Sequence, residues 1–96
     1  MGKKRMPRRT TTWYYVYVLL SLRDSLFYVG YTDNLQKRIQ EHNQGKVFST
    51  KSRRPLKIIY FEACFDEKDA KQREKYFKTG IGKRFLRQRL RNYLSK

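Results

Sequence analysis

Residues 13–31 read WYYVYVLLSLRDSLFYVGY, and the fold is decided in this stretch. Aromatic and β-branched side chains dominate residues 13–20 and again residues 26–31, which is typical of β-strands. Residues 21–25 lie between these two runs and have turn character. The stretch therefore predicts a β-hairpin.

The length of the hairpin turn determines which side chains share a face of the sheet. A turn of two or four residues places Tyr17 and Tyr28 on the same face and sets Tyr17 opposite Gly30, whereas an odd-length loop separates the two tyrosines. A glycine in a strand has no side chain to pack, so it leaves open space beside the tyrosine that faces it. Tyr14 and Tyr15 are expected to be core residues or cross-strand pairs.

A helix is expected to follow the hairpin. Thr32 or Asp33 is predicted to cap it, and it runs to about Gln44, where Gly45 ends it. A loop over residues 45–55 then alternates Lys and Arg with Ser and Thr.

The second half of the chain predicts one more strand and two more helices. Residues 56–64 form the strand, and the three acids within residues 66–69 open a helix whose dipole they suit. Residues 79–82 contain two glycines and break that helix, so the last helix begins near Lys83. The order β-β-α-β-α-α predicts an α+β domain with a small three-stranded sheet, antiparallel or mixed, flanked by helices.

The charge of the chain indicates its partner. The 96 residues include 24 Lys and Arg but only 8 Asp and Glu, which gives a formal net charge of +16. A polyanion relieves such self-repulsion, and nucleic acid is the usual one. An anionic membrane surface is the alternative, but the basic residues are spread over the whole chain instead of forming one face of an amphipathic helix.

The chain is expected to form one domain over residues 13–96, because 39% hydrophobic residues suffice for a single modest core. Residues 1–12 are expected to be a disordered basic arm, either lying along a phosphate backbone or uninvolved. Cys64 is the only cysteine, which leaves no disulfide framework or zinc-finger set and suggests a small buried thiol. No apolar run reaches membrane-spanning length, so the expected location is the cytoplasm, without a membrane partner.

Glu74 stands out among the eight acids, most of which suit turns, helix starts or a solvent face; Glu62 also has no evident place. On a helix, Glu74 lies four residues after Ala70 and three before Phe77, within the apolar face. A carboxylate buried there costs several kcal/mol unless a cation or a metal ion meets it. The alternatives are a structural ion pair with a nearby Arg and a metal ligand.

Arg38 and His42 form a second unusual pair. They are four residues apart and flank the Leu35/Ile39 stripe, so both lean toward the sheet. Taken separately, the histidine suits a rim or core position and the arginine suits an apolar surface that its stem covers. Together, in a basic protein, they indicate a phosphate clamp.

These residues carry a pattern that resembles the GIY-YIG nuclease family, and most closely its short stand-alone bacterial members. The pattern consists of Tyr15-Val16-Tyr17, Tyr28-Val29-Gly30, Arg38, His42 and Glu74. Further shared runs are YVGYT at residues 28–32, EHN at 41–43 and REK at 73–75. The resemblance covers residues 13–94.

The resemblance implies roles for five residues. Tyr17 and Tyr28 look like the two motif tyrosines. Arg38 looks like the arginine that binds the scissile phosphate, and His42 like the His/Tyr position beside it. Glu74 looks like the single carboxylate that holds one divalent metal ion.

The chain departs from the family pattern at three places. Tyr15 replaces the first motif glycine. Some members have a lysine shortly after the second motif, where this chain has Tyr31-Thr32-Asp33. The asparagine found late in several relatives has only Asn92 as its candidate.

The activity that the resemblance implies is metal-dependent endonucleolytic hydrolysis of phosphodiesters, without a covalent intermediate. One carboxylate suits a single Mg²⁺ or Mn²⁺, because Mg²⁺ keeps several waters and takes other ligands from substrate. Tyr17 is favoured as the base that activates water, with Tyr28 positioning water or phosphate, and His42 is an alternative proton relay.

The expected substrate is DNA in preference to RNA, selected by structure rather than sequence or with help from a protein partner, and DNA repair is one expected setting. Generic contacts to phosphates are expected from Lys46, Lys51, Arg53, Arg54, Arg84 and Arg87. One alternative is a non-catalytic nucleic-acid-binding module of the same fold, and another is a basic protein-interaction or ribosome-associated module.

Overall fold

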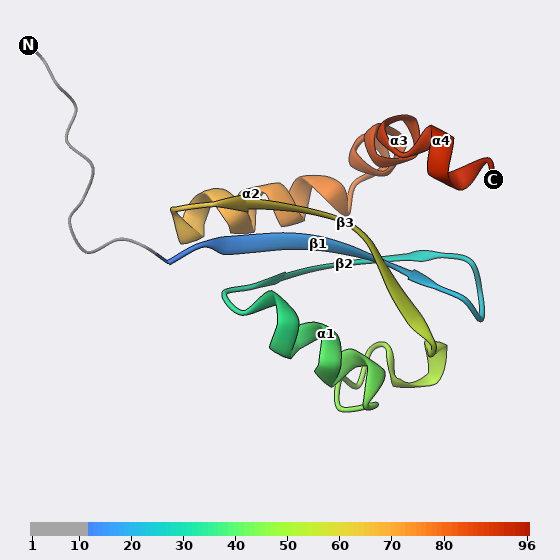
Figure 1. The fold of residues 1–96 in the computed structure, drawn as a ribbon. Helices are drawn as coiled ribbons and strands as arrows, with labels where there is room; N and C mark the ends of the chain where they lie inside the picture. Colours follow the sequence, from blue (N-terminus) through green and yellow to red (C-terminus); the bar gives the residue numbers. More distant parts are fainter. Residues whose placement is uncertain (1–11) are drawn as a thin grey trace, which may run out of the picture.

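The computed structural model describes residues 12–96, so the basic arm expected over residues 1–12 lies outside the described part except for Thr12. The elements in chain order are β1 (Tyr14–Ser21), β2 (Phe27–Thr32), α1 (Leu35–Asn43), a short 3₁₀ helix η1 (Lys51–Arg53), β3 (Leu56–Cys64), α2 (Glu67–Phe77), α3 (Gly80–Arg89) and α4 (Arg91–Leu94) (Figure 1). The α+β class is confirmed, and the three-stranded sheet is entirely antiparallel with the strand order β2-β1-β3.

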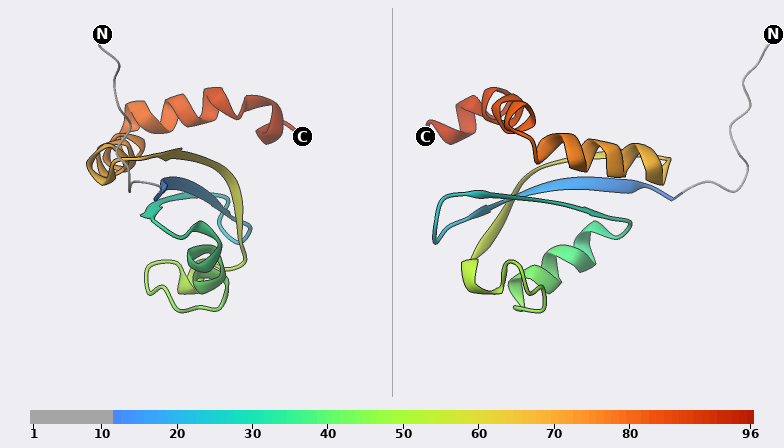
Figure 2. Two further views of the ribbon diagram at one scale, coloured as in Figure 1. Left: turned by 60° about the vertical axis from the view of Figure 1, so that its left-hand side comes forward. Right: turned by 180° about the vertical axis from the view of Figure 1, so that it is seen from behind.

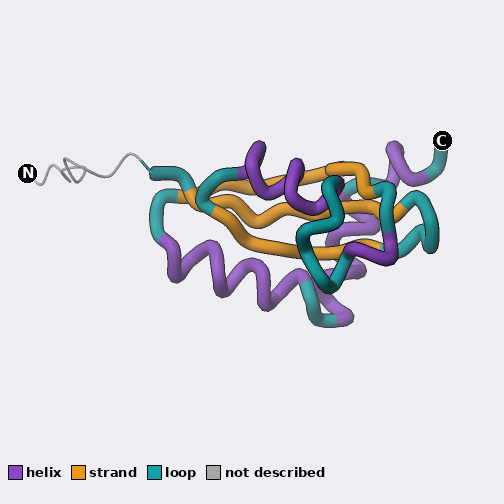
Figure 3. The backbone as a smooth tube through the Cα atoms, turned by 90° about the horizontal axis from the view of Figure 1, so that it is seen from below, coloured by secondary structure: helices purple, strands orange, loops and turns teal. Residues whose placement is uncertain are grey.

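The sheet lies between two helical layers. Helix α1 covers one face, whereas α2 and α3 lie on the other (Figures 1 and 2). Seen from below, the three strands run side by side along the molecule (Figure 3). Alternate residues of β1 therefore enter two separate cores. Val16 and Val18 pack with Ala70, Phe77 and Leu86 on the α2–α3 side.

The core on the α1 side is built around Tyr17, Leu19 and Leu56, against which Leu35 and Ile39 of α1 pack. This is the face that carries the candidate site. Among the described residues, no helix has the length and apolar character needed to cross a membrane.

The hairpin has the even-length loop, which is the alternative that places Tyr17 opposite Gly30. The backbone N–H of Ser21 donates to the Leu26 carbonyl at 3.0 Å, which leaves residues 22–25 as an even, four-residue loop. Tyr17 is consequently paired with Gly30. Tyr28 lies on the same face of the sheet as Tyr17, as expected from an even loop.

Two predicted helix starts are wrong because side-chain caps act elsewhere. The cap of α1 is Asn34, whose side chain accepts a hydrogen bond from the Lys37 N–H at 3.2 Å. Helix α3 begins at Gly80, three residues before the predicted Lys83, because the Thr79 hydroxyl accepts the Gly82 N–H at 3.0 Å. A threonine at that position satisfies an otherwise unpaired first-turn donor. The last helix is also divided, with a short α4 after α3.

Glu62 has a structural partner. Its carboxylate accepts two hydrogen bonds from Arg73, at 2.9 and 3.1 Å, and one from the Tyr60 hydroxyl at 2.9 Å. The Arg73 guanidinium also lies 4.5 Å from the centre of the Phe77 ring. Glu62 therefore fastens β3 to α2. Cys64 is half-buried at the end of β3 rather than fully buried as expected.

Candidate active site

A chain of three buried polar side chains links β1, α1 and the loop that follows α1. The Tyr17 hydroxyl lies 2.8 Å from His42 Nε2, and His42 Nδ1 lies 2.7 Å from the Thr50 hydroxyl. Tyr17 is only 1% exposed, and His42 and Thr50 are fully buried. Both imidazole nitrogens thus have a partner, which fixes the ring orientation. Sequence reasoning missed Thr50, because a threonine in a Ser/Thr-rich loop carries no signal that it is buried.

Gly30 makes the position of Tyr17 possible. The tyrosine ring crosses directly over this glycine, and a Cβ atom added there would overlap the hydroxyl and ring, with Tyr17 Cε1 2.9 Å away. Because β2 is the edge strand, the buried Tyr17 hydroxyl crosses toward that edge, where it meets His42. The Tyr28 ring packs edge-on against His42 on the same face, with ring centres 5.1 Å apart.

Arg38 lies next to this buried chain and also reaches solvent. Its guanidinium lies beside the Tyr17 hydroxyl, and its Nη1 donates to Glu41 Oε1 at 3.0 Å. The side chain is 37% exposed and lines an open polar cavity of about 430 Å³ together with residues such as Lys37 and Asn34. Arg38 can therefore contact a bound anion and Tyr17 at the same time.

The site holds both of its proton-carrying groups neutral near pH 7. Burial raises the pKa of Tyr17 to about 12, although the Arg38 guanidinium opposes the shift. Burial and then the positive charge of Arg38 lower the pKa of His42 to about 4. A neutral imidazole can accept a hydrogen bond from the Tyr17 hydroxyl at Nε2 while Nδ1–H donates to Thr50.

Acidification is expected to destabilise the protein through His42. In the unfolded chain the pKa of His42 returns to its ordinary value near 6.5, so the unfolded state binds a proton that the folded state excludes until about pH 4. The stabilisation is complete above about pH 6.5 and is lost as the pH falls toward 4, by at most about 3 kcal/mol. Urea unfolding at about pH 7 and about pH 4.5 measures this loss.

His42→Gln is the control for that measurement and should lose less stability than the parent over the same interval. The Arg53 ion pair lowers the pKa of Asp24 to about 2, so its own contribution is lost only at lower pH. An equal loss in parent and variant would contradict the assignment to His42.

Glu74 lies on α2 and therefore on the other side of the sheet. Its negative charge is nevertheless near enough to raise the pKa of Tyr17, as one of the smaller contributions after burial. The carboxylate pairs with Lys78 at 3.0 Å, so the ion pair that was one of the two alternatives is formed with a lysine and not with an arginine. Its side chain is 24% exposed, less deeply buried than its position on the apolar face suggested.

The surroundings of Glu74 suit a sparsely ligated hard cation. Within residues 12–96, no group of three or more His, Cys, Asp and Glu side chains could hold a metal ion. The Glu74 carboxylate is partly accessible, and Lys78, at 52% exposure, can move aside. An ion that takes one carboxylate and keeps several waters, as Mg²⁺ does, fits this single donor.

The six predicted phosphate contacts do not share one surface. Lys46, Lys51 and Arg54 are exposed in the loop after α1, whereas Arg84 and Arg87 belong to α3 on the other side of the sheet (Figure 1). The sixth, Arg53, is committed to the hairpin turn, since its Nε donates to Asp24 at 2.7 Å and its Nη2 to the Leu26 carbonyl at 3.1 Å. Asn92 is exposed on α4, which follows α3 and is separate from α1.

Comparison with known proteins identifies relatives of the chain. It is 45% identical over 69 residues to a UPF0213 protein of Bacillus licheniformis, covering 71% of this chain and 70% of that one. It is 43% identical over 84 residues to a UPF0213 protein of Lactiplantibacillus plantarum, covering 81% and 82%. The solution NMR structure of a UPF0213 protein from Bacillus halodurans aligns with a TM-score of 0.49 at 30% identity, covering 77% of this chain and 81% of that one.

The family model for the GIY-YIG catalytic domain matches residues 13–88, which include Tyr17, Gly30, Arg38, His42 and Glu74. This range takes in all three strands and most of the helical residues. The chain therefore belongs to the GIY-YIG family.

Proposed function

We propose that the protein is a divalent-metal-dependent endonuclease that hydrolyses phosphodiester bonds of nucleic acid, DNA in preference to RNA, selecting its substrate by structure rather than sequence. The observation that carries this proposal is the buried Tyr17–His42–Thr50 chain, which ends beside the partly exposed Arg38 in a member of the GIY-YIG family. A protein that only bound phosphates would need the arginine but would gain nothing from a proton-transferring pair behind it.

Arg38 binds the scissile phosphate in this proposal. Its guanidinium balances the negative charge that grows on the phosphoryl oxygens as water attacks. Being 37% exposed, it reaches a substrate on the surface, while Glu41 holds it from one side. Lys46, Lys51 and Arg54 extend the contact along the nucleic acid from the same side of the sheet, and Arg84 and Arg87 provide a second, separate contact.

Tyr17 acts as the base that receives a proton from the attacking water. In the free protein its pKa of about 12 opposes this role, so positive charge beside the hydroxyl is required. His42 is the alternative proton relay: it would accept the Tyr17 proton at Nε2 as the tyrosine oxygen takes up the proton of the water, and because its own pKa is lowered to about 4, this role requires the negative charge of a bound phosphate nearby. Thr50 accepts from Nδ1–H and so keeps the other imidazole nitrogen free for this transfer. Tyr28, packed against His42, positions water or phosphate.

Glu74 would hold the metal ion. A bound Mg²⁺ or Mn²⁺ supplies positive charge to phosphoryl oxygens and makes water more acidic. The Glu74 carboxylate keeps a single negative charge beside a strongly basic site, which favours a cation there over another anion. Asn92 has no role in this proposal, because it lies on α4 apart from these groups.

Cleavage assays on one panel of substrates test the function. Single-stranded, duplex, nicked, flapped and branched DNA and RNA are each incubated with Mg²⁺, with Mn²⁺ or with EDTA. Product is expected only with a divalent ion, and Arg38→Ala should reduce its rate roughly 10²- to 10³-fold, the effect of removing one preorganised charge-stabilising donor.

Arg23→Ala is the matched control, since it removes an exposed arginine from the hairpin turn without touching the site. Its cleavage rate should stay near that of the parent. Binding that persists in EDTA, with no metal-dependent product from any substrate, would instead support a non-catalytic nucleic-acid-binding module.

A further inference from the structure

Four aromatic side chains lie together where β1 begins and β3 ends, and we call them the aromatic stripe: Trp13, Tyr15, Phe61 and Phe65. The Trp13 and Phe65 rings stack with centres 4.1 Å apart, and the Tyr15 and Phe61 rings meet edge to face at 5.9 Å. Strand alternation places Tyr15 and Phe61 on the same face as Tyr17, because Tyr17 pairs with Phe61 and Tyr15 with Ala63, and Trp13 and Phe65 follow directly on the ends of these two strands. The stripe and the candidate active site thus share one face of the sheet.

Folding does not account for the stripe. Helix α1 covers the part of this face that carries Tyr17 and Leu19 and leaves the stripe open. Trp13, Phe61 and Phe65 are 45%, 50% and 39% exposed, whereas core aromatics of this chain such as Phe77 are fully buried. Contiguous exposed apolar surface on a small, highly charged protein marks a site of interaction.

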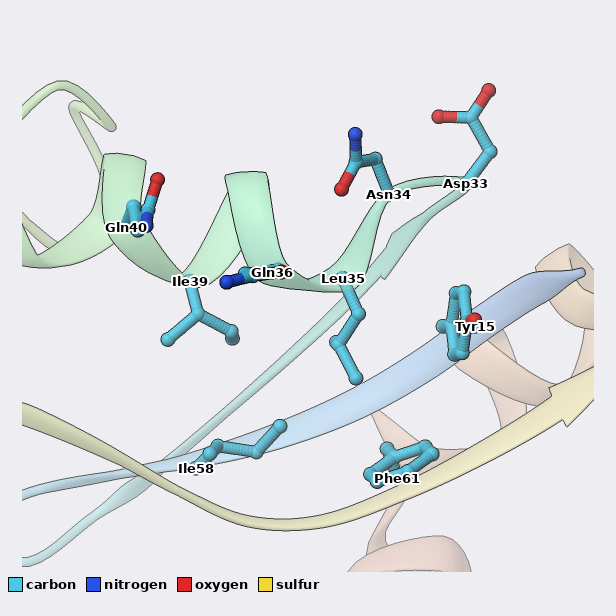
Figure 4. A pocket seen from close by; sticks show the side chains of 9 residues that line it. All are labelled: Tyr15, Asp33, Asn34, Leu35, Gln36, Ile39, Gln40, Ile58 and Phe61. Atoms are coloured by element: carbon cyan, nitrogen blue, oxygen red, sulfur yellow. The ribbon is translucent and has the colours of Figure 1, made fainter.

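A groove of about 620 Å³ lies between α1 and two residues of the stripe, Tyr15 and Phe61 (Figure 4). Tyr15, Phe61 and Ile58 form its sheet side, and Leu35 and Ile39 point into it from the helix. Polar side chains complete the lining, and these are Asp33, Asn34, Gln36 and Gln40. The groove therefore combines flat apolar walls with amide groups that can both donate and accept hydrogen bonds.

The groove is adjacent to the cavity that contains Arg38. Asp33 and Asn34, at the start of α1, line both spaces. A nucleic-acid strand whose phosphate contacts Arg38 can pass around the start of α1 and bring its next bases to the aromatic stripe. Aromatic rings bind bases by stacking whatever the sequence, and the net charge of +16 favours a polyanion over an apolar protein segment.

We infer that the aromatic stripe and its groove bind unpaired nucleobases of the same nucleic acid that the active site cuts. An unpaired segment next to the scissile bond is then the structural feature that the enzyme selects. This inference rests on the proposed function for the identity of its ligand, but it concerns binding and does not require cleavage.

Trp13 is the only tryptophan, so its fluorescence reports on the stripe directly. The full chain is titrated in EDTA with an oligothymidylate, with an abasic oligonucleotide of the same length and with a blunt duplex. Only the oligothymidylate should quench Trp13, and it should bind roughly tenfold or more tightly than the abasic strand, since each base–aromatic stack has about that effect. An oligouridylate in parallel distinguishes DNA from RNA as the source of the bases.

Phe61→Ala should lose roughly tenfold in affinity for oligothymidylate and none for the abasic strand. Phe61→Tyr keeps a stacking ring and should bind like the parent. Leu22→Ala is the control, because Leu22 is an apolar side chain of similar exposure, 56%, in the hairpin turn. Circular dichroism establishes that each variant is folded.

Three results would each overturn the inference. The first is equal affinity of the parent for abasic and normal strands, and the second is equal affinity of Phe61→Ala and Leu22→Ala for oligothymidylate. The third is a dimer in sedimentation whose interface buries Trp13. The abasic comparison uses the parent chain and so does not depend on any variant folding. Base-dependent binding without cleavage would support the inference about the aromatic stripe and refute the proposed nuclease function. Metal-dependent cleavage without base-dependent binding would support the proposed nuclease function and refute the inference about the aromatic stripe.

Discussion

Glu74→Gln is expected to lower the rate of metal-dependent cleavage at least about 10³-fold, because it removes the carboxylate proposed to hold the ion, and the charge stabilisation that the ion supplies amounts to several kcal/mol. The amide has nearly the same shape as the carboxylate, and among residues 12–96 Glu74 makes only one ion pair, with the exposed Lys78. The free energy of unfolding should therefore change by less than about 1 kcal/mol. Single-turnover cleavage in Mg²⁺ and binding in EDTA are the two measurements.

Glu67→Gln is the matched control on the same helix. Glu67 also pairs with a lysine four residues later, Lys71, at 3.5 Å, and it is exposed; unlike Glu74 it accepts a hydrogen bond from the Tyr31 hydroxyl, which glutamine can still accept through its amide oxygen. Its replacement should leave the cleavage rate within a few-fold of the parent. If Glu74→Gln and Glu67→Gln cleave equally fast, the metal role of Glu74 is refuted, whereas a loss of binding in EDTA would point to a structural role instead.

Gly30→Ala is the substitution with the next largest expected effect. It should lower the stability of the protein, which is the opposite of the usual effect of Gly→Ala in a strand. Alanine in place of a strand glycine ordinarily stabilises a protein by about 0.5–1 kcal/mol. Here the added Cβ overlaps the Tyr17 ring, which is buried and held by its hydrogen bond to His42. Overpacking of this kind costs about 1–3 kcal/mol. A displacement of the hydroxyl by about 1 Å is expected to reduce cleavage roughly 10²-fold.

Gly80→Ala provides the comparison for Gly30→Ala. A Cβ atom at Gly80 would meet no other atom within 4 Å, and the residue opens α3. This variant is expected to be as stable as the parent or up to about 1 kcal/mol more stable, and equally active. Urea unfolding and cleavage are measured on both variants. A Gly30→Ala protein that is more stable than the parent and fully active would show that Tyr17 does not need its place above the glycine.

The hairpin was predictable because its information is local. A run of aromatic and β-branched residues, a turn and a second run specify two strands, and an even loop sets Tyr17 opposite Gly30. The helix starts were harder to predict from the sequence. Asn34 and Thr79 act as caps only because the backbone after each turns toward its side chain, and neighbouring residues such as Thr32 carry the same chemistry.

Glu74 and Glu62, the two acids without an evident place in the sequence, illustrate a different limit of prediction from sequence. Reasoning from the apolar face of α2 singled out Glu74, but it could not identify Lys78 as the partner or the side chain as partly exposed. Glu62 has no local signal, because its partner Arg73 is eleven residues away on another element. Ion pairs between elements depend on how the elements pack, which hydrophobic periodicity does not specify.

The sequence by itself determined the fold class, the hairpin and a strongly basic chain in which Arg38, His42 and Glu74 stand out, whereas the structure decided between an even and an odd hairpin loop. Only the tertiary structure decided that His42 is enclosed between Tyr17 and Thr50, that Arg53 is bound to the hairpin turn and that the side chains of Trp13, Phe61 and Phe65 remain exposed. The reason is physical. Strands and helices follow from short-range periodicity, whereas burial, and with it the pKa of His42, depends on residues that are distant in the chain and meet only when the sheet and helices pack.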